Sequence, residues 1–272
     1  MLHQRDAFLT EIYHAAQRDN KVMLLNADFG APALDRFREE LPAQFVHCGI
    51  SEQNMINVAV GLALQGRQVY TYCMAPFVLR AYEQLKLAAV MGVPINIIAV
   101  GAGLSYAGSG PTHYSLEDIA AYRALPAVNV YTASTANLAA SIAALTLSSN
   151  RMNIIRLERG ELPEIYPQPN AAIGYAGDGH FLACGYLVHW LRARGHFVID
   201  VFRQKPISPL LVMQLEQYNN VYTFEEQYGG FGNAIIEALN EYGKKTRVFK
   251  RCLPERGLYE NGTRDELIEA LL

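Results

Sequence analysis

Short apolar runs rich in β-branched residues alternate with longer segments of helical periodicity through the first 157 positions of the chain. Because neighbouring parallel strands need a crossover connection, this alternation predicts a mainly parallel sheet with helices on both faces. After Ser51, a suitable N-cap residue, apolar residues at Met55, Val58, Ala59 and Leu62 recur at helical spacing and predict a helix with one buried stripe. The strands expected in this part of the chain are 21–26, 44–48, 68–73, 95–100, 128–131 and 153–157.

A proline-rich segment interrupts this periodicity and divides the chain. Pro163, Pro167 and Pro169 fall within a few residues of one another, which is typical of an interdomain linker. Beyond it, runs at 181–184, 197–202, 220–224 and 247–250 again alternate with helical patterns. We therefore expect an α/β fold with two doubly wound, mainly parallel-sheet domains, at 1–162 and 173–272, joined by a linker at 163–172.

The composition narrows the function classes. The chain has 272 residues, 51% hydrophobic and 18% charged, which is enough to bury two compact cores. Its net charge of −3 and the lack of basic runs argue against a nucleic-acid partner, and no apolar stretch reaches the ~20 residues that a membrane helix needs. Four widely spaced cysteines predict reduced core thiols and no metal site, so the cytoplasm is the expected compartment.

Three segments that follow expected strands carry candidate chemistry, because parallel sheets bind ligands at the carboxyl ends of their strands. Segment 49–54 places Glu52 at a helix start, where a favourable contact with the helix dipole is the simpler interpretation. Segment 76–84 begins a helix that contains Phe77, Arg80 and Tyr82. Aromatic residues such as Phe77 and Tyr82 more often pack in a core than stack on a ligand. Segment 101–113 is a long glycine-rich loop that ends in His113.

Taken in order, the three segments resemble the carboxyl-terminal half of transketolase and the related deoxyxylulose-phosphate synthase. The family pattern Gly-Ile-x-Glu-Gln is similar to residues 49–53, Phe-x-x-Arg-x-Tyr to residues 77–82, and Gly-Pro-Thr-His to residues 110–113. The resemblance extends from about Asn26 to the tail at 261–263. It implies that 1–162 is a pyrimidine-binding domain for thiamine diphosphate and that 173–272 is a transketolase C-terminal-like domain.

The resemblance also implies which residues bind the cofactor. Glu52 would hold a proton against the aminopyrimidine nitrogen, a proton relay between a side chain and a cofactor that acts as an electron sink. Phe77 would pack on the pyrimidine ring, as aromatic rings do in offset stacks. Ile50 and Tyr82 complete the expected cofactor-binding set.

The expected substrate-binding residues are Arg80, Ser109, His113 and Arg159. His113 resembles the family histidine that bonds substrate oxygens near the reacting carbon, which makes it a second catalytic candidate beside Glu52. Arg159 and Arg80 would bind a substrate phosphate through the guanidinium fork, although a surface salt bridge is an alternative for either. Ser109 stands where transketolases usually carry aspartate, and Met74 stands where the synthases tend to have tyrosine, so the substrate stays open.

The chain lacks a recognisable site for the diphosphate. Gly177-Asp178-Gly179 resembles the start of the family's metal and diphosphate motif, but no asparagine occurs between Asp178 and Asn219 to complete it, so we interpret the tripeptide as a turn. The resemblance thus implies a split enzyme in which a separate amino-terminal transketolase subunit holds the diphosphate and most of the Mg2+. Glu225 and Glu226 resemble a family stretch used for packing and dimer contact, and Asp28 is a candidate interface residue.

The expected function is therefore the transfer of a two-carbon ketol unit from a ketose phosphate to an aldehyde, in a heterotetramer or around a homodimer of this chain. A subunit that decarboxylates pyruvate, as in the synthase, is the alternative within enzymes, and a 2-oxoacid dehydrogenase beta subunit is a more distant one. A non-catalytic binding or regulatory homologue is the alternative from another class.

Overall fold

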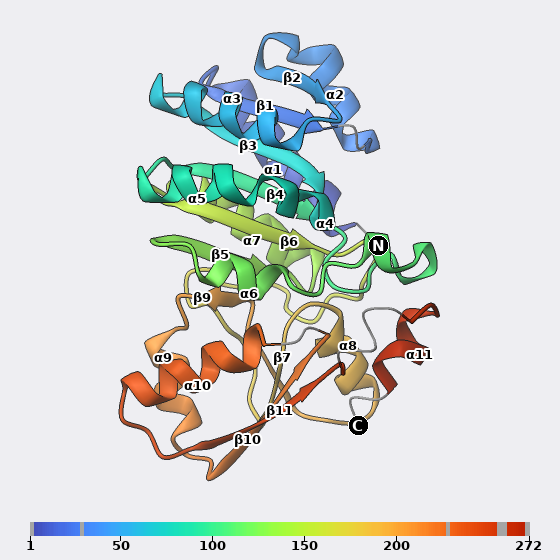
Figure 1. Cartoon of the computed structure of the whole chain (residues 1–272), viewed down its shortest axis with the longest axis vertical. Coiled ribbons are helices and arrows are strands. Elements are labelled where there is room, and N and C mark those ends of the chain that lie inside the picture. The colour runs from blue at the N-terminus through green and yellow to red at the C-terminus, as the bar shows by residue number, and fades with distance from the viewer. Residues whose placement is uncertain (1–2, 28–29, 227–228, 255–259, 270–272) are drawn as a thin grey trace.

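The computed structural model describes residues 3–27, 30–226, 229–254 and 260–269, so the candidate interface residue Asp28 lies outside it. Two sheets lie one above the other along the long axis of the molecule (Figure 1), each with helices on both faces. The predicted fold class, α/β with two doubly wound and mainly parallel sheets, is confirmed.

The larger sheet has seven strands in the order β2-β1-β3-β4-β6-β5-β9, and all of its neighbours pair in parallel except β5 with β9. The carboxyl ends of its parallel strands therefore share one edge, which is the geometry that places ligand-binding loops together. The six strands expected in this region are all present. The strands are β1 (Val22–Ala27), β2 (Phe45–Gly49), β3 (Gln68–Met74), β4 (Ile95–Val100), β5 (Val128–Thr132), β6 (Met152–Leu157) and β9 (Arg203–Lys205).

Helices cover both faces of this sheet, and its central strands are therefore buried along their length except for the first residue of β3. Phe8, Phe37 and Leu138 belong to the core on one face, beneath α1, α2 and α7. Met55 and Leu85 belong to the core on the other, beneath α3, α5 and α6. The helical segments are α1 (Gln4–Arg18), α2 (Pro32–Glu40), η1 (Pro42–Gln44), α3 (Glu52–Leu64), α4 (Ala75–Val78), η2 (Leu79–Ala81), α5 (Tyr82–Val90), η3 (Ala107–Ser109), η4 (Pro111–His113), α6 (Asp118–Arg123) and α7 (Ala136–Thr146).

The smaller sheet is entirely parallel, with the strand order β11-β10-β7-β8. Leu187 and Leu267 belong to the core on one of its faces, and Leu211 and Phe231 belong to the core on the other. Its strands are β7 (Phe181–Ala183), β8 (Val198–Asp200), β10 (Asn220–Glu225) and β11 (Arg247–Cys252), and its helices are α8 (Tyr186–Ala193), α9 (Pro209–Leu215), α10 (Phe231–Glu241) and α11 (Arg264–Ile268).

One strand crosses between the two parts of the chain. Strand β9 follows β8 in sequence, yet it pairs antiparallel with β5 at the edge of the larger sheet. Phe202, which lies between β8 and β9, is buried in a core of the larger sheet. The division at 162 and 173 stays a prediction, but residues from 202 to 205 pack with the larger sheet.

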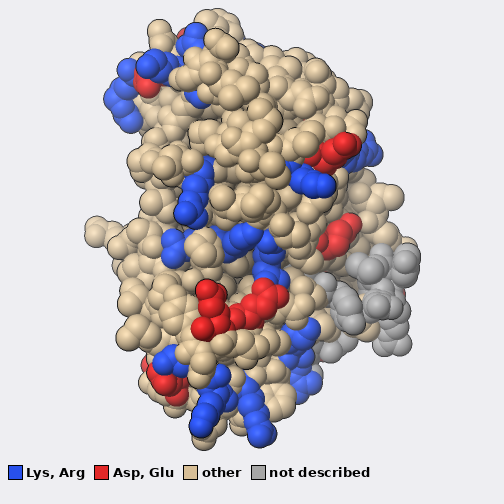
Figure 2. Space-filling view, turned by 60° about the vertical axis from the view of Figure 1, so that its left-hand side comes forward, with Lys and Arg blue, Asp and Glu red and all other residues tan. Residues whose placement is uncertain are grey.

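Charged side chains are unevenly spread over the face of the molecule seen in Figure 2. They lie in a band across the middle, at the lower end and at the upper left edge, and the centre of the upper half is uncharged. Cys48, Cys73, Cys184 and Cys252 are all free thiols. Among the described residues, no helix is both long enough and apolar enough to span a membrane.

Candidate active site

The carboxyl edge of the larger sheet brings together the segments that carry candidate chemistry in the sequence. Strand β2 ends at Gly49, whose φ of 70° is in the left-handed region that favours glycine. Helix α3 then begins at Glu52. Ser51 precedes the helix as expected but forms no side-chain cap, because its hydroxyl donates to the Cys48 carbonyl at 2.6 Å.

Glu52 is buried but has few ion-pair or hydrogen-bond partners. It is 7% exposed, and among the described residues its only ion-pair partner is Arg80, with Nη1 at 3.9 Å from Oε2. No hydrogen bond from those residues reaches the Glu52 carboxylate. Burial raises the pKa of the nearby Cys73 thiol to about 12, and the Glu52 charge adds to that rise. A shielded carboxylate with unused acceptor positions is thus available to an outside hydrogen-bond donor.

A continuous row of contacts runs from this carboxylate along the strand ends. The Arg80 guanidinium lies 4.9 Å from the centre of the Phe77 ring, and that ring meets His113 edge-on at 6.0 Å between centroids. The His113 ring lies 6.4 Å from Tyr106, over which the Arg159 guanidinium lies at 4.8 Å. We call this set the site row: Glu52, Arg80, Phe77, His113, Tyr106 and Arg159.

Tyr106 is a member of the site row that the sequence does not single out, although it lies within the glycine-rich segment. Its ring touches both His113 and Arg159 and so joins the loop after β4 to the loop after β6. The signal that could have identified it is an aromatic residue in a loop otherwise built of small residues. The His113 ring is further oriented through Nδ1, which lies 2.9 Å from the Thr112 hydroxyl.

Three other predicted residues are not joined to the site row by any of these contacts. The Tyr82 hydroxyl donates to the Ala121 carbonyl at 3.1 Å and so ties α5 to α6. Ser109 is exposed in η3, and the Ile50 side chain is 74% exposed beside Glu52. Their cofactor-binding and substrate-binding roles stay predictions.

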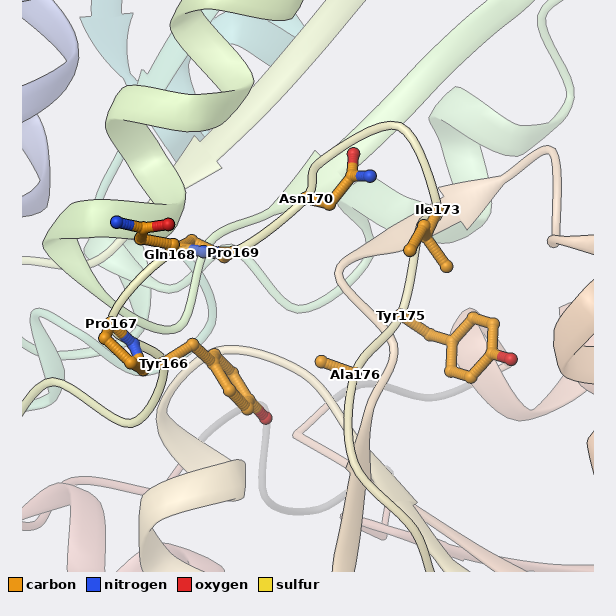
Figure 3. Close-up of a pocket in the computed structure, with 8 residues that line it drawn as sticks. All are labelled: Tyr166, Pro167, Gln168, Pro169, Asn170, Ile173, Tyr175 and Ala176. Carbon is orange, nitrogen blue, oxygen red and sulfur yellow. The ribbon is translucent and has the colours of Figure 1, made fainter.

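A cavity lies away from the site row. Its volume is about 700 Å³, and Figure 3 shows it inside the proline-rich segment between the two sheets, between Tyr166 and Tyr175. No residue of the site row lines it. Within the site row, Arg80 and Arg159 are exposed and Phe77, Tyr106 and His113 are half-buried, so a small molecule there would need a second surface to enclose it.

The resemblance of residues 177–179 to a diphosphate motif has a purely local explanation. Asp178 accepts hydrogen bonds from the Gly179 amide and the Tyr218 hydroxyl, both at 2.8 Å, and Gly177 and Gly179 have φ values of 94° and 127°. Gly179 and His180 form a bend directly before β7, and Gly177 and Asp178 precede it without regular structure. Among the described residues, no group of three or more His, Cys, Asp or Glu side chains could hold a metal ion.

Comparisons with known proteins agree with this geometry. Residues 1–164 match the family model described as the transketolase pyrimidine binding domain. The chain is 29% identical over 271 residues to one of the apulose-4-phosphate transketolase subunits of Phocaeicola vulgatus, covering 91% of this chain and 87% of that protein. It is 27% identical to transketolase-like protein 2 of Mus musculus, covering 99% of this chain but 46% of that protein. The chain therefore spans about half the length of such longer relatives.

Solved structures give the same result. The structure described as a split gene transketolase, an inactive beta4 tetramer, is 26% identical to this chain, with a TM-score of 0.84 over 99% of this chain and 93% of the other. The transketolase of Campylobacter jejuni shares the fold, with a TM-score of 0.77 at 17% identity, over 99% of this chain and 44% of the other.

Proposed function

The chain belongs to the transketolase family, and from that premise we propose that it is the cofactor-activating subunit of a split, thiamine-diphosphate-dependent transketolase. The observation that carries the proposal is the site row, in which a shielded carboxylate, an aromatic ring, a histidine and an arginine follow one another along one edge. The proposed reaction transfers a two-carbon ketol unit from a ketose phosphate to an aldehyde.

The residues at the Glu52 end of the site row suit an aminopyrimidine ring. When bound, thiamine diphosphate supplies the electron sink that stabilises the carbanion left when a bond beside a carbonyl breaks. Glu52 can form a hydrogen bond with a ring nitrogen and take part in a proton relay, because its carboxyl group is buried and accepts no hydrogen bond from the described residues. Phe77 is half-buried and offers a ring on which a planar heterocycle can stack.

The other end of the site row suits the sugar phosphate. His113 can donate to or accept from substrate hydroxyl and carbonyl oxygens near the reacting carbon, and its ring is fixed by Phe77, Tyr106 and Thr112. Arg159 is exposed, and its guanidinium can bind a phosphate in bidentate fashion. Arg159 and Glu52 lie at opposite ends of the site row, so a phosphate bound by Arg159 would be kept apart from the carboxylate that acts on the cofactor. Ser109, in place of the usual aspartate, leaves the identity of the sugar open.

A partner subunit would enclose the open side of the site row. The Ile50 side chain, two positions before Glu52, is 74% exposed, and the Arg80 and Arg159 side chains are exposed too, so all three are available to a partner. We propose that a subunit with the diphosphate-binding domain and Mg2+ covers the site row.

Titration with thiamine diphosphate tests whether diphosphate binding requires the partner subunit. We expect the purified chain alone to bind thiamine diphosphate weakly, and the complex with a diphosphate-binding transketolase subunit to bind it tightly in the presence of Mg2+. Calorimetry of the two samples measures the difference. Tight, magnesium-dependent binding by this chain alone would contradict the split-enzyme proposal. Release of carbon dioxide from pyruvate by the complex would show that the reaction is decarboxylation and not ketol transfer.

A further inference from the structure

A buried ionic cluster lies directly behind the site row, where the carboxyl edges of the two sheets meet. The Arg264 guanidinium, at the start of α11, bonds two carboxylates at once. It donates to Glu226 Oε1 at 2.5 Å and Oε2 at 2.8 Å, and to Glu158 Oε2 at 2.7 Å and Oε1 at 3.1 Å. We call Glu158, Glu226 and Arg264 the interdomain clamp, because Glu158 follows β6 in the larger sheet and the other two belong to the smaller-sheet part of the chain.

The clamp is shielded and nearly saturated with hydrogen bonds. The exposed fractions of the Arg264, Glu158 and Glu226 side chains are 14%, 2% and 7%. Although burial opposes it, the Arg264 charge holds the pKa of the Glu158 carboxyl below its usual value. Glu158 also accepts from the Ser105 hydroxyl and the Tyr186 amide, and Arg264 lies over the Tyr186 ring at 4.1 Å. Such a network resists rearrangement because any broken contact leaves a buried charge unpaired.

The clamp touches the two loops that carry the substrate end of the site row. Glu226 Oε2 accepts from the Leu104 amide at 3.3 Å, and Ser105, which bonds Glu158, directly precedes Tyr106. Glu158 itself directly precedes Arg159. Gly103 allows the close approach, since a Cβ at that position would overlap the Glu226 carboxylate. Within the described chain, the hydrogen bonds and ion pairs of the clamp do not extend to the cofactor end of the row, at Glu52, Arg80 and Phe77.

From these contacts we propose that Arg264 is a positioning residue through which the smaller-sheet domain sets the phosphate-binding end of the site, acting on Tyr106 and Arg159 while leaving the cofactor end unaffected. The proposal rests on the proposed function for the meaning of those two ends. Its geometry is independent of that function, because one guanidinium fixes the loop after β4 to the loop after β6.

Hydrogen exchange of the full chain tests the geometric part without any enzyme assay. In R264A we expect amide exchange in residues 101–114 to rise roughly 10-fold, with β10, α9 and α10 unchanged. R194A is the matched control, because Arg194 also lies over an aromatic ring, Trp190 at 3.9 Å, and pairs with a glutamate, Glu269 at 3.1 Å, but contacts neither loop. Unchanged exchange in 101–114, or a rise throughout the smaller-sheet domain, would overturn the proposal. Should R264A fail to fold, E226Q supplies the same measurement.

Kinetics of the complex with its diphosphate-binding partner test the functional part. In R264A we expect KM for a phosphorylated ketol donor to rise roughly 10-fold with kcat within about twofold, and KM for a donor without phosphate to stay the same. Added methylguanidinium is expected to restore KM in R264A. Equal loss for both donors, or a loss of thiamine diphosphate affinity, would overturn the proposal. An inactive wild-type complex would instead refute the proposed function, and hydrogen exchange would still decide the positioning role.

Discussion

The site row and the interdomain clamp use the same kinds of side chain in opposite ways. Glu52 pairs with Arg80 at a distance of 3.9 Å, and the Arg80 side chain is 59% exposed. Arg264 makes four contacts with carboxylate oxygens of 3.1 Å or less, and its side chain is 14% exposed. Both pairs lie at the carboxyl edge of the larger sheet.

The contrast shows that unused hydrogen-bonding capacity, and not the presence of charge, marks the part of the edge that can bind a ligand. A carboxylate that accepts several hydrogen bonds inside the protein has no position left for a substrate, whereas Glu52 keeps its positions open. Changes in the site row should therefore alter function with little change in stability, whereas changes in the clamp should lower stability in addition to any effect on substrate binding.

The largest effect is expected from Glu52→Gln. The amide cannot give and take the proton that the cofactor requires, so turnover of the complex should fall roughly 10²- to 10⁴-fold. The free energy of unfolding should stay within about 1 kcal/mol of the wild type, because only one distant ion pair is lost. Steady-state assays and urea denaturation measure the two quantities. Glu83→Gln, an exposed change on α5, is the control, and full activity in E52Q would refute the catalytic role.

The next effect concerns the clamp. Glu158→Gln leaves the Arg264 charge with one carboxylate instead of two, and we expect it to lower the free energy of unfolding by about 3 kcal/mol. Urea denaturation measures the loss. The surface pair of Glu216 with Lys244 gives the control, since Glu216→Gln should change stability by less than about 1 kcal/mol. Equal effects of the two variants would show that the clamp contributes no more than a surface pair.

A third carboxyl group extends the comparison, because Asp200 is as buried as the clamp but forms no ion pair with any described residue. Burial raises its pKa to about 7, and the Ser134 hydroxyl is a hydrogen-bond partner of its carboxyl group. Since the folded pKa is above the usual value of 3.8, its contribution to stability is complete below that value and is lost as the pH rises through about 7.

We therefore expect the wild-type free energy of unfolding to fall between about pH 4 and pH 7 more steeply than that of Asp200→Asn. Denaturation at a series of pH values measures both slopes. Asp178→Asn is the control, because hydrogen bonds from Tyr218 and Gly179 lower the pKa of that exposed carboxyl, and its removal should not affect the neutral range. Parallel slopes for wild type and D200N would contradict the raised pKa.

The smallest effect is expected at the aromatic position of the site row. Phe77→Ala removes a stacking surface that contributes about 1 kcal/mol, so thiamine diphosphate affinity of the complex should fall roughly fivefold. Calorimetric titration measures the change. Phe249→Ala is matched to it, since Phe249 is also partly exposed and stacks on Tyr222 at 5.3 Å in the smaller sheet. Unchanged affinity in F77A would place the pyrimidine elsewhere.

Much of the architecture could be predicted from local pattern. All ten expected strands are present. Most are runs of buried residues that stand out from their surroundings, whereas β2 and β11 are half-buried or exposed. The run 197–202 is expected as one strand, but its residues are divided. Phe197 is 83% exposed, β8 covers Val198–Asp200, and Phe202 packs with the larger sheet. Apolar composition alone could not show which of two cores a residue would join.

The site was predictable to the extent that its residues follow strands. Strand order places Glu52, Phe77 and His113 on one edge, and the family motifs identify them in advance. The interdomain clamp could not be foreseen, because Arg264 and Glu158 are separated by 106 positions and neither lies in a distinctive motif. Strand β9 does not stand out in the sequence because Arg203–Lys205 is short and polar and pairs with a strand distant along the chain.

Strand β9 also determines where the chain can be truncated. A truncation ending at residue 162 would remove β9 and leave the hydrogen-bonding edge of β5 bare. It would also remove Phe202 from a core of the larger sheet. Uncovered strand edges template association with other chains, so such a fragment should aggregate even though most of its sheet is intact. A fragment intended for crystallisation or display of the larger-sheet domain should therefore continue through residue 205.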